Sequence, residues 1–329
     1  MKAAFIHQPG APETIQFGEL PAPKPEPQQV LVRVGAVAVN PIDTYIRSGL
    51  VKMNLPLPFI VGCDLAGTVE EVGAQVQGLQ RGDRVWGSNQ GLLGRQGTFA
   101  EFAAVDAQWL YPTPPNVSDE DAAALALVGI TARLGLGRAR LQPGEILFVN
   151  GGTGGVGSAV VQMAKAMGAR VIATAGTDAK AEECRRLGAD LAVNYQTQDV
   201  DAAIRAFAPE GVNVWWETQR EPDFERTVTL LAMHGRMILM AGREAKPLFP
   251  VGSFYVKCCA LHGFAMFNTS AEEQRACAGD INRWLAEGRL HARIDRVLPL
   301  AQTAEAHRWQ EENTIGKKGT LAGKIVLRP

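Results

Sequence analysis

The stretch Ile146-Leu147-Phe148-Val149-Asn150-Gly151-Gly152-Thr153-Gly154-Gly155-Val156-Gly157 predicts a buried strand, a tight turn and a helix in immediate succession. Four apolar residues in a row are typical of a strand that is covered on both faces of a parallel sheet. Residues 152–157 match the pattern G-x-G-x-x-G, whose glycines permit the turn, the approach of a pyrophosphate to the backbone and close helix packing. The helix would run from about 155 to 167, with its first amides facing the phosphates. We therefore predict a dinucleotide site at this turn.

Length, composition and charge set the broad class of the protein. The chain has 329 residues, of which 46% are hydrophobic and 20% charged, as in an ordinary globular protein of about two domains. The net charge of −1 gives no indication of the excess of positive charge that is typical of proteins that bind nucleic acid or an anionic membrane. The N-terminus lacks the apolar core of a signal peptide, and the uncharged run 146–164 is too rich in glycine for a membrane span. Five scattered cysteines favour a reduced, cytoplasmic protein over a disulfide framework.

Strand and helix patterns alternate from about residue 145 onward, in units of roughly 20–25 residues. This alternation predicts a doubly wound parallel sheet, whereas residues 1 to about 120 read as β-rich. The expected strands of the sheet are 146–150, 170–175, 191–194, 212–216, 236–241 and a sixth within 260–266, and the expected helices are 155–167, 178–187, 199–207 and 223–232. The tail is expected to return to a helix at 271–287, a strand at 294–299, a helix at 303–312 and a strand at 323–328.

This organisation resembles the medium-chain dehydrogenase/reductase superfamily, in particular its zinc-free, zeta-crystallin-like NADPH:quinone oxidoreductases. The segments that carry the resemblance are NPIDTYIRSG at 40–49, GDRV at 82–85, the glycine turn, TAGT at 174–177 and GKIVL at 323–327. The resemblance implies an α/β fold in which a Rossmann dinucleotide-binding domain, residues 123–267, accompanies a GroES-like catalytic domain. The GroES-like domain would be built from residues 1–122 and 268–329. The active site would lie in the cleft between the two domains.

Zinc-using members of the superfamily carry a ligand cysteine, a Gly-His-Glu and a later cysteine around a catalytic metal. This sequence has Asn40 at the first place and Gly62-Cys63-Asp64 at the second, and 124–128 contains neither Cys nor His. A catalytic zinc needs three protein ligands and one open position, which Cys63 alone does not provide. We therefore predict that the protein holds no metal.

Hydride transfer to an acceptor that needs little polarisation is the chemistry that remains without a metal, and quinones and α,β-unsaturated carbonyls are such acceptors. By the resemblance, Asn40, Asp43 and Tyr45 lie at the floor of the active site as catalytic residues. Asn40 could donate to an acceptor oxygen and Tyr45 could donate a hydrogen bond or a proton, whereas Asp43 can equally be a structural partner. Two alternatives stay open: an alkenal, enoyl or enoyl-CoA reductase on the same scaffold, and an NADPH-binding structural or sensor protein without turnover.

The end of the second expected strand indicates which cofactor is preferred. An NAD enzyme of this fold normally places Asp or Glu there, but residues 170–175 are followed by Gly176 and Thr177. Gly176 leaves room for a 2′-phosphate, which the Lys180 ammonium and the Tyr195 hydroxyl could bind. Asp178 is a possible ribose acid, but we interpret it as a first-turn acid favoured by the helix dipole. The sequence therefore predicts NADPH.

Further cofactor contacts follow from the glycine turn and from the resemblance. They are Gly152, Thr153, Gly154, Gly155 and Val156 in the turn, together with Thr131, Gly242, Arg243, Phe264 and Phe267. Of the adjacent Trp215 and Trp216, one is expected in the core, and the other could wall the cofactor cleft. Relatives often carry a second tyrosine after the Ser-Gly pair, where this chain has 50–52 (LVK), so a less polar acceptor pocket is expected.

The apolar strand expected near 260–266 would form an edge of the sheet. Exposed edges of this kind invite pairing across a two-fold axis. We therefore predict a homodimer that forms through this edge.

Overall fold

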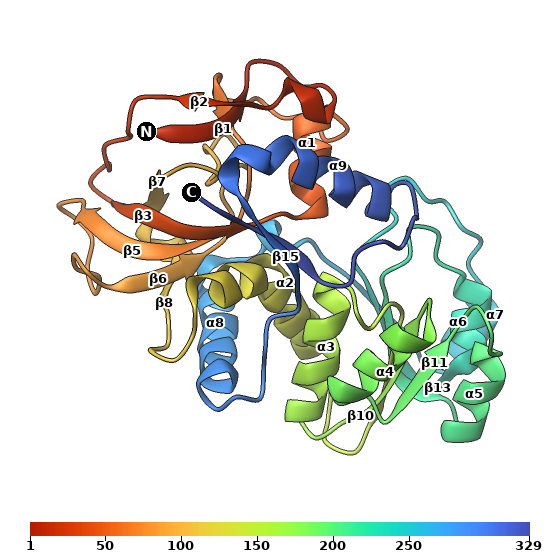
Figure 1. Ribbon diagram of the computed structural model, residues 1–329. Helices are drawn as coiled ribbons and strands as arrows, with labels where there is room; N and C mark the ends of the chain where they lie inside the picture. The colour runs from red at the N-terminus through yellow and green to blue at the C-terminus, as the bar shows by residue number, and fades with distance from the viewer. The chain divides into compact units, whose positions relative to one another are not determined.

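The computed structural model describes all 329 residues, and the chain separates into two compact units (Figure 1). Unit 1 comprises Met1–Val128, Ala271–Ala286 and His291–Pro329, so it contains both ends of the chain. Unit 2 comprises Gly129–Ser270 and Glu287–Leu290. The division falls inside helix α2 (Asp119–Arg138). The sequence interpretation placed its first boundary after residue 122, also within this helix, and its second after residue 267.

Unit 2 contains a six-stranded sheet with the strand order β11-β10-β9-β12-β13-β14, and every neighbouring pair is parallel. Its strands are β9 (Ile146–Val149), β10 (Arg170–Ala175), β11 (Leu191–Asn194), β12 (Val212–Glu217), β13 (Leu231–Leu239) and β14 (Ala260–Gly263). Its further helices are α3 (Gly155–Ala166), α4 (Asp178–Arg186), α5 (Val200–Phe207), α6 (Phe224–Leu230) and α7 (Val251–Val256). The prediction of a doubly wound parallel sheet is confirmed. The strand order reverses at β9, and a ligand site is expected at the carboxyl end of such a switch point.

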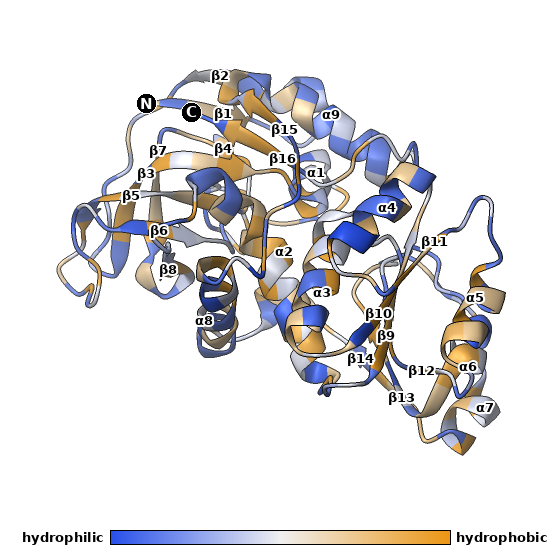
Figure 2. Ribbon diagram, turned by 60° about the horizontal axis from the view of Figure 1, so that its bottom comes forward, coloured by the Kyte–Doolittle hydropathy of each residue, from blue (hydrophilic) through white to orange (hydrophobic).

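The core of unit 2 is built from the apolar strands. Figure 2 shows β9 and β10 as largely hydrophobic and α4 as largely hydrophilic. The Phe148 and Trp215 rings lie 4.0 Å apart by their centroids, and Trp215 and Trp216 are both 0% exposed. A Cβ on Gly135 of α2 would lie 2.3 Å from the Trp216 ring, so glycine permits this close packing. Both tryptophans therefore belong to the core. The expectation that one of them could wall the cofactor cleft is not met, because neither has exposed surface.

Two features of unit 2 differ from the sequence interpretation. Strand β13 begins at Leu231, directly after α6, whereas a helix to residue 232 and a strand from 236 were expected. The reason is that Leu231 pairs with Val212, before a bulge shifts the register to Val214 and Arg236. Helix α7 was not predicted; it is short, and no residue in it is buried.

Unit 1 is β-rich, with a seven-stranded sheet and a separate three-stranded sheet of order β2-β1-β4. The strand order of the larger sheet is β15-β16-β3-β5-β6-β8. Its seventh strand, β7, pairs with β3 and is not part of that sequence of neighbours. The strands are β1 (Lys2–Ile6), β2 (Gln16–Glu19), β3 (Gln29–Ala38), β4 (Phe59–Ile60), β5 (Leu65–Val72), β6 (Arg84–Gly87), β7 (Phe102–Asp106), β8 (Leu110–Pro112), β15 (Ile294–Pro299) and β16 (Lys324–Arg328). The further helices are α1 (Pro41–Ser48), α8 (Ala271–Ala286) and α9 (Thr303–Thr314). None of the helices is long and apolar enough to cross a membrane.

The C-terminal strand positions the site described below. Strand β16 pairs antiparallel with β3, with Val326 opposite Ala38, and the Val39 amide donates to the Ile325 carbonyl at 2.9 Å. This register brings Lys324, the first residue of β16, next to the segment that leads from β3 into α1. Residues from the two ends of the chain thus meet at the start of α1.

Candidate active site

Helix α1 and Asn40, the residue that precedes it, contain the three residues that the sequence interpretation named as catalytic. The helix begins after Asn40, whose extended backbone (φ −122°) and following proline are typical of a helix start. The Asp43 carboxylate closes the first turn by accepting from the Asn40 amide at 2.8 Å. Asn40 is 0% and Asp43 2% exposed, whereas Tyr45 is half-buried. Tyr45 is therefore the only one of the three with accessible surface of any size.

The Asn40 side chain is held by three partners. Its Nδ2 donates to the Ala38 carbonyl at 3.2 Å and to Asp64 Oδ2 at 2.7 Å, and its Oδ1 accepts from Lys324 Nζ. Both amide hydrogens are therefore engaged inside unit 1. Donation from Asn40 to an acceptor, as predicted from the sequence, would require one of these bonds to break.

Asp64 and Lys324 are buried members of this cluster that the sequence interpretation did not assign to the site. Asp64 Oδ1 accepts from Ser88 Oγ at 2.6 Å and from the Leu127 amide at 3.1 Å. Lys324 Nζ donates to the Val39 carbonyl at 2.7 Å and lies 3.8 Å from Asp64 Oδ2. Lys324 belongs to the GKIVL segment at 323–327, which carries part of the family resemblance, but the resemblance assigned this lysine no role.

A second buried cation anchors α1 from the side of α9. Arg47 is 0% exposed; its guanidinium donates to the Gly10 carbonyl and pairs with Glu311 of α9. The helix that presents Tyr45 is thus fixed at its start by β16 and near its end by α9. This anchoring limits the positions that the Tyr45 hydroxyl can reach.

The glycine turn forms a cradle at the carboxyl end of β9. The Gly151 amide donates to Thr174 Oγ1 at 3.0 Å and the Gly152 amide to the Thr174 carbonyl at 2.9 Å, which ties the turn to β10. A Cβ on Gly157 would lie 2.1 Å from the Gly151 carbonyl oxygen, so this position needs glycine for packing. A Cβ on Gly154, in contrast, would meet nothing closer than 3.4 Å. No side chain caps the start of α3, which leaves its first amides available to an anion.

Of the residues predicted to bind a 2′-phosphate, Gly176 and Tyr195 lie together just after the ends of β10 and β11. A Cβ on Gly176 would lie 2.6 Å from the Tyr195 hydroxyl, so that hydroxyl sits directly over the glycine. Tyr195 is 55% exposed, and Lys180 lies half-buried in the first turn of α4, whose N-cap is Thr177. Asp178 accepts from Asn194 Nδ2 at 2.7 Å, a contact that orients its carboxylate toward β11.

Most of the remaining predicted cofactor residues also follow the carboxyl ends of strands. Gly242 and Arg243 come after β13; Gly242 has φ +80°, and a Cβ there would lie 2.7 Å from the Arg220 carbonyl oxygen. Phe264 and Phe267 follow β14, and both are half-buried. Thr153, Gly155 and Val156 lie in the glycine turn and the first turn of α3, whereas Thr131 is buried in α2 at 4% exposure.

Glu217 is a residue at this edge of the sheet that the sequence interpretation missed. It is 2% exposed and accepts from Asn150 Nδ2 at 3.0 and 3.1 Å and from the Trp215 indole at 3.1 Å. Thr218 Oγ1 donates to the Asn150 carbonyl at 2.9 Å. Glu217, at the end of β12, therefore holds Asn150, the residue that leads into the glycine turn. The sequence feature that could have identified it is an acidic residue at the end of an apolar strand.

Comparison with known proteins agrees with this arrangement. A family model described as the alcohol dehydrogenase GroES-like domain matches residues 26–115, and one described as zinc-binding dehydrogenase matches residues 155–279. A quinone oxidoreductase from Sus scrofa is 32% identical, with 99% of this chain and 97% of the relative covered. The chain belongs to the medium-chain dehydrogenase/reductase family.

Other members show how wide the family is. A 2-haloacrylate reductase from a Burkholderia species is 31% identical over 99% of this chain and 98% of the relative. Among solved structures, an NAD-dependent alcohol dehydrogenase is similar with a TM-score of 0.88 at 32% identity, over the full length of both chains. The Escherichia coli quinone oxidoreductase complexed with NADPH is similar with a TM-score of 0.85 at 27% identity, again over the full length of both. The prediction of a Rossmann domain with a GroES-like domain is thereby confirmed, and the protein is an oxidoreductase.

The residues around Asn40 of this family member do not fit a catalytic zinc. Burial raises the pKa of the Cys63 thiol well above its usual value, and the neighbouring Asp43 raises it further. Burial also raises the pKa of Asp43 to about 7. No group of three or more His, Cys, Asp or Glu side chains is arranged to hold a metal ion. Lys324 instead places an ammonium beside Asn40 and Asp64.

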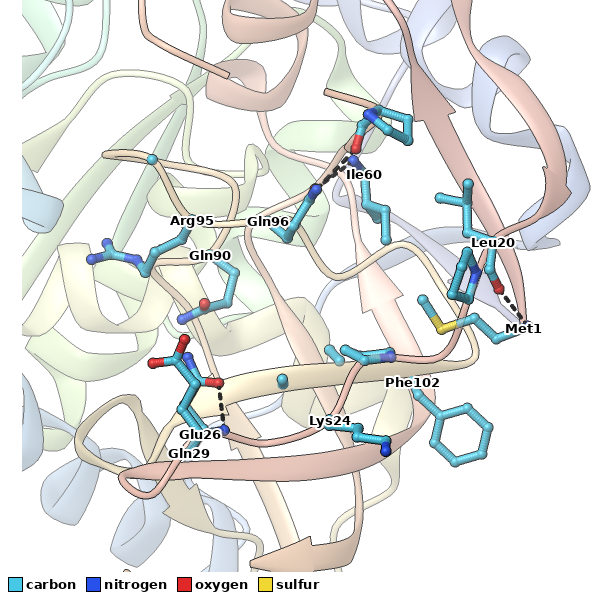
Figure 3. A pocket seen from close by; sticks show the side chains of 17 residues that line it. Met1, Leu20, Lys24, Glu26, Gln29, Ile60, Gln90, Arg95, Gln96 and Phe102 are labelled. Atoms are coloured by element: carbon cyan, nitrogen blue, oxygen red, sulfur yellow. Dashed lines mark hydrogen bonds between the residues drawn. The ribbon is translucent and has the colours of Figure 1, made fainter. Parts of the chain in front are cut away.

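A groove of about 440 Å³ lies in unit 1 (Figure 3). It runs between the proline-rich segment 21–27 and the loop 94–97. Gln96 braces one wall by donating to the Pro56 and Pro58 carbonyls, at 2.9 Å each. None of the residues predicted for catalysis or for cofactor binding lines this groove.

Proposed function

We propose that this family member is a zinc-independent, NADPH-dependent reductase that transfers hydride to quinones or related conjugated carbonyls. The observation that carries the proposal is the carboxyl edge of the Rossmann sheet. There the uncapped start of α3 follows β9, and the Tyr195 hydroxyl lies over Gly176 after β10. The Escherichia coli relative that was solved with NADPH supports the same cofactor.

The chain's own residues suit a 2′-phosphorylated cofactor. The first amides of α3 bind the pyrophosphate, and the open side of Gly154 lets it approach the backbone. Lys180 and Tyr195 bind the 2′-phosphate, since no acid stands at the tip of β10 to hold a free ribose hydroxyl. Asp178 is directed to Asn194 and does not take that place.

The acceptor side relies on hydrogen bonding. NADPH supplies the hydride when bound, so the protein has to orient an acceptor and stabilise or protonate its oxygen. With the Asn40 amide engaged in the cluster, Tyr45 is the donor for that oxygen. Quinones and enones suit such a site, because they accept hydride without a metal that polarises the carbonyl.

An acceptor panel tests the proposal directly. We expect NADPH to be oxidised, with a fall in its absorbance, when 1,2-naphthoquinone or 9,10-phenanthrenequinone is the acceptor. With NADH in place of NADPH, the same acceptors should be reduced more slowly. Faster reduction of 2-alkenals than of any quinone would favour the alternative, an alkenal or enoyl reductase, which the 2-haloacrylate reductase relative supports. The absence of oxidation with every acceptor would favour a binding protein without turnover.

Tyr45→Phe should lower kcat/KM for a good quinone by about 10- to 100-fold, or about 1.4–2.7 kcal/mol, because the transition state loses a donor. NADPH affinity should stay unchanged. Steady-state kinetics and a cofactor titration measure the two quantities, and Tyr255→Phe, at an exposed tyrosine of α7, is the matched control. An unchanged kcat/KM would reduce Tyr45 to a wall residue.

We also propose a homodimer that forms through β14. This strand lies at the edge of the sheet, and exposed apolar side chains occur in it and in the segment that precedes it in the chain. They are Leu248, Val251, Tyr255, Val256 and Leu261, with exposures of 92%, 64%, 66%, 63% and 38%. Pairing of two β14 strands would cover Leu261 and satisfy the unpaired backbone groups of the edge.

Light scattering should therefore give twice the chain mass of 35.3 kDa at micromolar concentration. Leu261→Lys should shift the protein toward the monomer, since a charge at the centre of a covered edge opposes pairing. Phe17→Lys, at the 41% exposed Phe17 of β2, should leave the mass unchanged. A monomeric mass for the unaltered protein would contradict the proposal.

A cytoplasmic location is proposed as well. All five cysteines are free thiols, and Cys63, Cys184 and Cys277 are buried. Such usage suits a reducing compartment. Cell fractionation would test it, and recovery from an oxidising compartment would contradict it.

A further inference from the structure

A buried ammonium lies at the centre of the polar cluster that precedes α1. The Lys324 side chain is 6% exposed, and its Nζ donates to the Val39 carbonyl and to Asn40 Oδ1. The groups that face it are Asp43 on α1 and Cys63 and Asp64 before β5. The backbone is arranged to bring it there: Gly323 has φ +123°, and a Cβ at that position would lie 2.3 Å from the Arg293 carbonyl oxygen.

The charged pair of this cluster is the Asp64 carboxylate and the Lys324 ammonium. The raised pKa of the Cys63 thiol keeps it neutral, and Asp43, with a pKa of about 7, carries only part of a charge near neutral pH. Burial raises the pKa of Asp64, while Lys324, Asn40 and Ser88 oppose that rise. Burial lowers the pKa of Lys324 in turn, while Asp64, Asp43 and Cys63 oppose that fall. A buried carboxylate needs a compensating cation or several donors, and Lys324 Nζ lies 3.8 Å from Asp64 Oδ2, where it can compensate the carboxylate.

We propose that Lys324 is the resident cation of this polar cluster: its ammonium compensates Asp64, holds Asn40 and thereby positions the first turn of α1. Lys324 is a positioning residue, because it acts on the acceptor only through α1 and Tyr45. Because this ammonium already supplies a positive charge beside Asp64, the proposal predicts that the cluster holds no metal ion. The effect on turnover rests on the proposed function, whereas the effects on stability and metal content do not.

The test compares Lys324→Met with the double variant Asp64→Asn/Lys324→Met. At pH 8, Lys324→Met leaves the Asp64 carboxylate without its cation, and the Tm should fall by about 5–10 °C. The double variant removes both charges and should regain most of that loss. Lys318→Met is the matched control, because Lys318 is 56% exposed and pairs with Glu312 at the surface.

A pH series separates charge compensation from packing. Without Lys324 the pKa values of Asp64 and Asp43 both rise, so the folded variant binds more protons than the unaltered protein does. The Tm deficit of Lys324→Met should therefore shrink as the pH falls from 8 to 5.5. A deficit that stays constant with pH, or a double variant no more stable than Lys324→Met, would show that Lys324 only fills space.

Turnover supplies an independent readout. Lys324→Met should lower kcat/KM for a quinone by about tenfold or more while the Kd for NADPH stays within about twofold. An unchanged kcat/KM would overturn the positioning role even if the charge pair is confirmed. If the unaltered protein reduces no acceptor, the proposed function fails, and the Tm cycle still decides the role of Lys324.

Elemental analysis tests the metal side of the inference. The purified protein should contain no stoichiometric zinc, and treatment with a chelator should leave its Tm and activity intact. One tightly bound zinc per chain, whose removal lowers the Tm, would overturn the assignment of Lys324 as the resident cation.

Discussion

Gly154→Ala should weaken NADPH and NADH about 10- to 100-fold alike, or about 1.4–2.7 kcal/mol, and leave the Tm of the cofactor-free protein unchanged. The backbone at Gly154 is extended (φ −70°), and a Cβ there would meet nothing closer than 3.4 Å. Alanine therefore fits the folded chain. Its methyl group would stand where the pyrophosphate has to approach the backbone, so only the complex is affected.

Gly157→Ala should behave differently, although it lies only three residues away. Its Cβ would lie 2.1 Å from the Gly151 carbonyl oxygen, which is backbone and cannot rotate aside. Both the Tm and cofactor binding should fall, with overpacking costing about 1–3 kcal/mol. Gly279→Ala is the matched control, because a Cβ on Gly279 of α8 has nothing within 4 Å. Fluorescence titration and thermal melts measure the effects; equal losses of Tm for Gly154→Ala and Gly157→Ala would contradict this account of the turn.

Lys180→Glu should weaken NADPH by at least about 1–3 kcal/mol, or roughly 5- to 150-fold, and leave NADH nearly unchanged. The substitution replaces an ammonium in the first turn of α4 by a carboxylate that repels the 2′-phosphate. NADH carries no phosphate at that position, so it serves as an internal reference. Kd values for both cofactors, measured at the same ionic strength, give the selectivity.

The control for Lys180→Glu is Arg186→Glu, which makes the same charge change near the end of α4, where Arg186 is 71% exposed. It should alter neither affinity by more than about twofold, because exposed charges are screened beyond a Debye length of about 10 Å. Equal losses for NADPH and NADH in Lys180→Glu would show that the 2′-phosphate pocket has been misplaced. If the unaltered protein prefers NADH, the 2′-phosphate pocket has likewise been misplaced; one relative of known structure is NAD-dependent.

The prediction from sequence was most successful where the signal is local. The glycine turn, the absence of an acid after β10 and the alternation of apolar and amphipathic segments depend on neighbouring residues, and they located the strands of unit 2 closely. It was less successful where a partner element sets the boundary. Leu231 joins a strand because Val212 lies opposite it, and nothing in the segment around Leu231 signals that pairing.

The candidate site divides in the same way. The sequence by itself determined the Rossmann turn and the residues that follow each carboxyl strand end, whereas the helix that starts after Asn40 was not predicted. Only the tertiary structure decided what those side chains contact: Asp178 with Asn194, Asn150 with Glu217, and Asn40 with Lys324. The last pair is separated by 284 positions, and burial in one cluster changes both the charge balance and the freedom of Asn40. Local patterns specify backbone conformation, whereas burial and charge depend on residues that the fold brings together from distant parts of the chain.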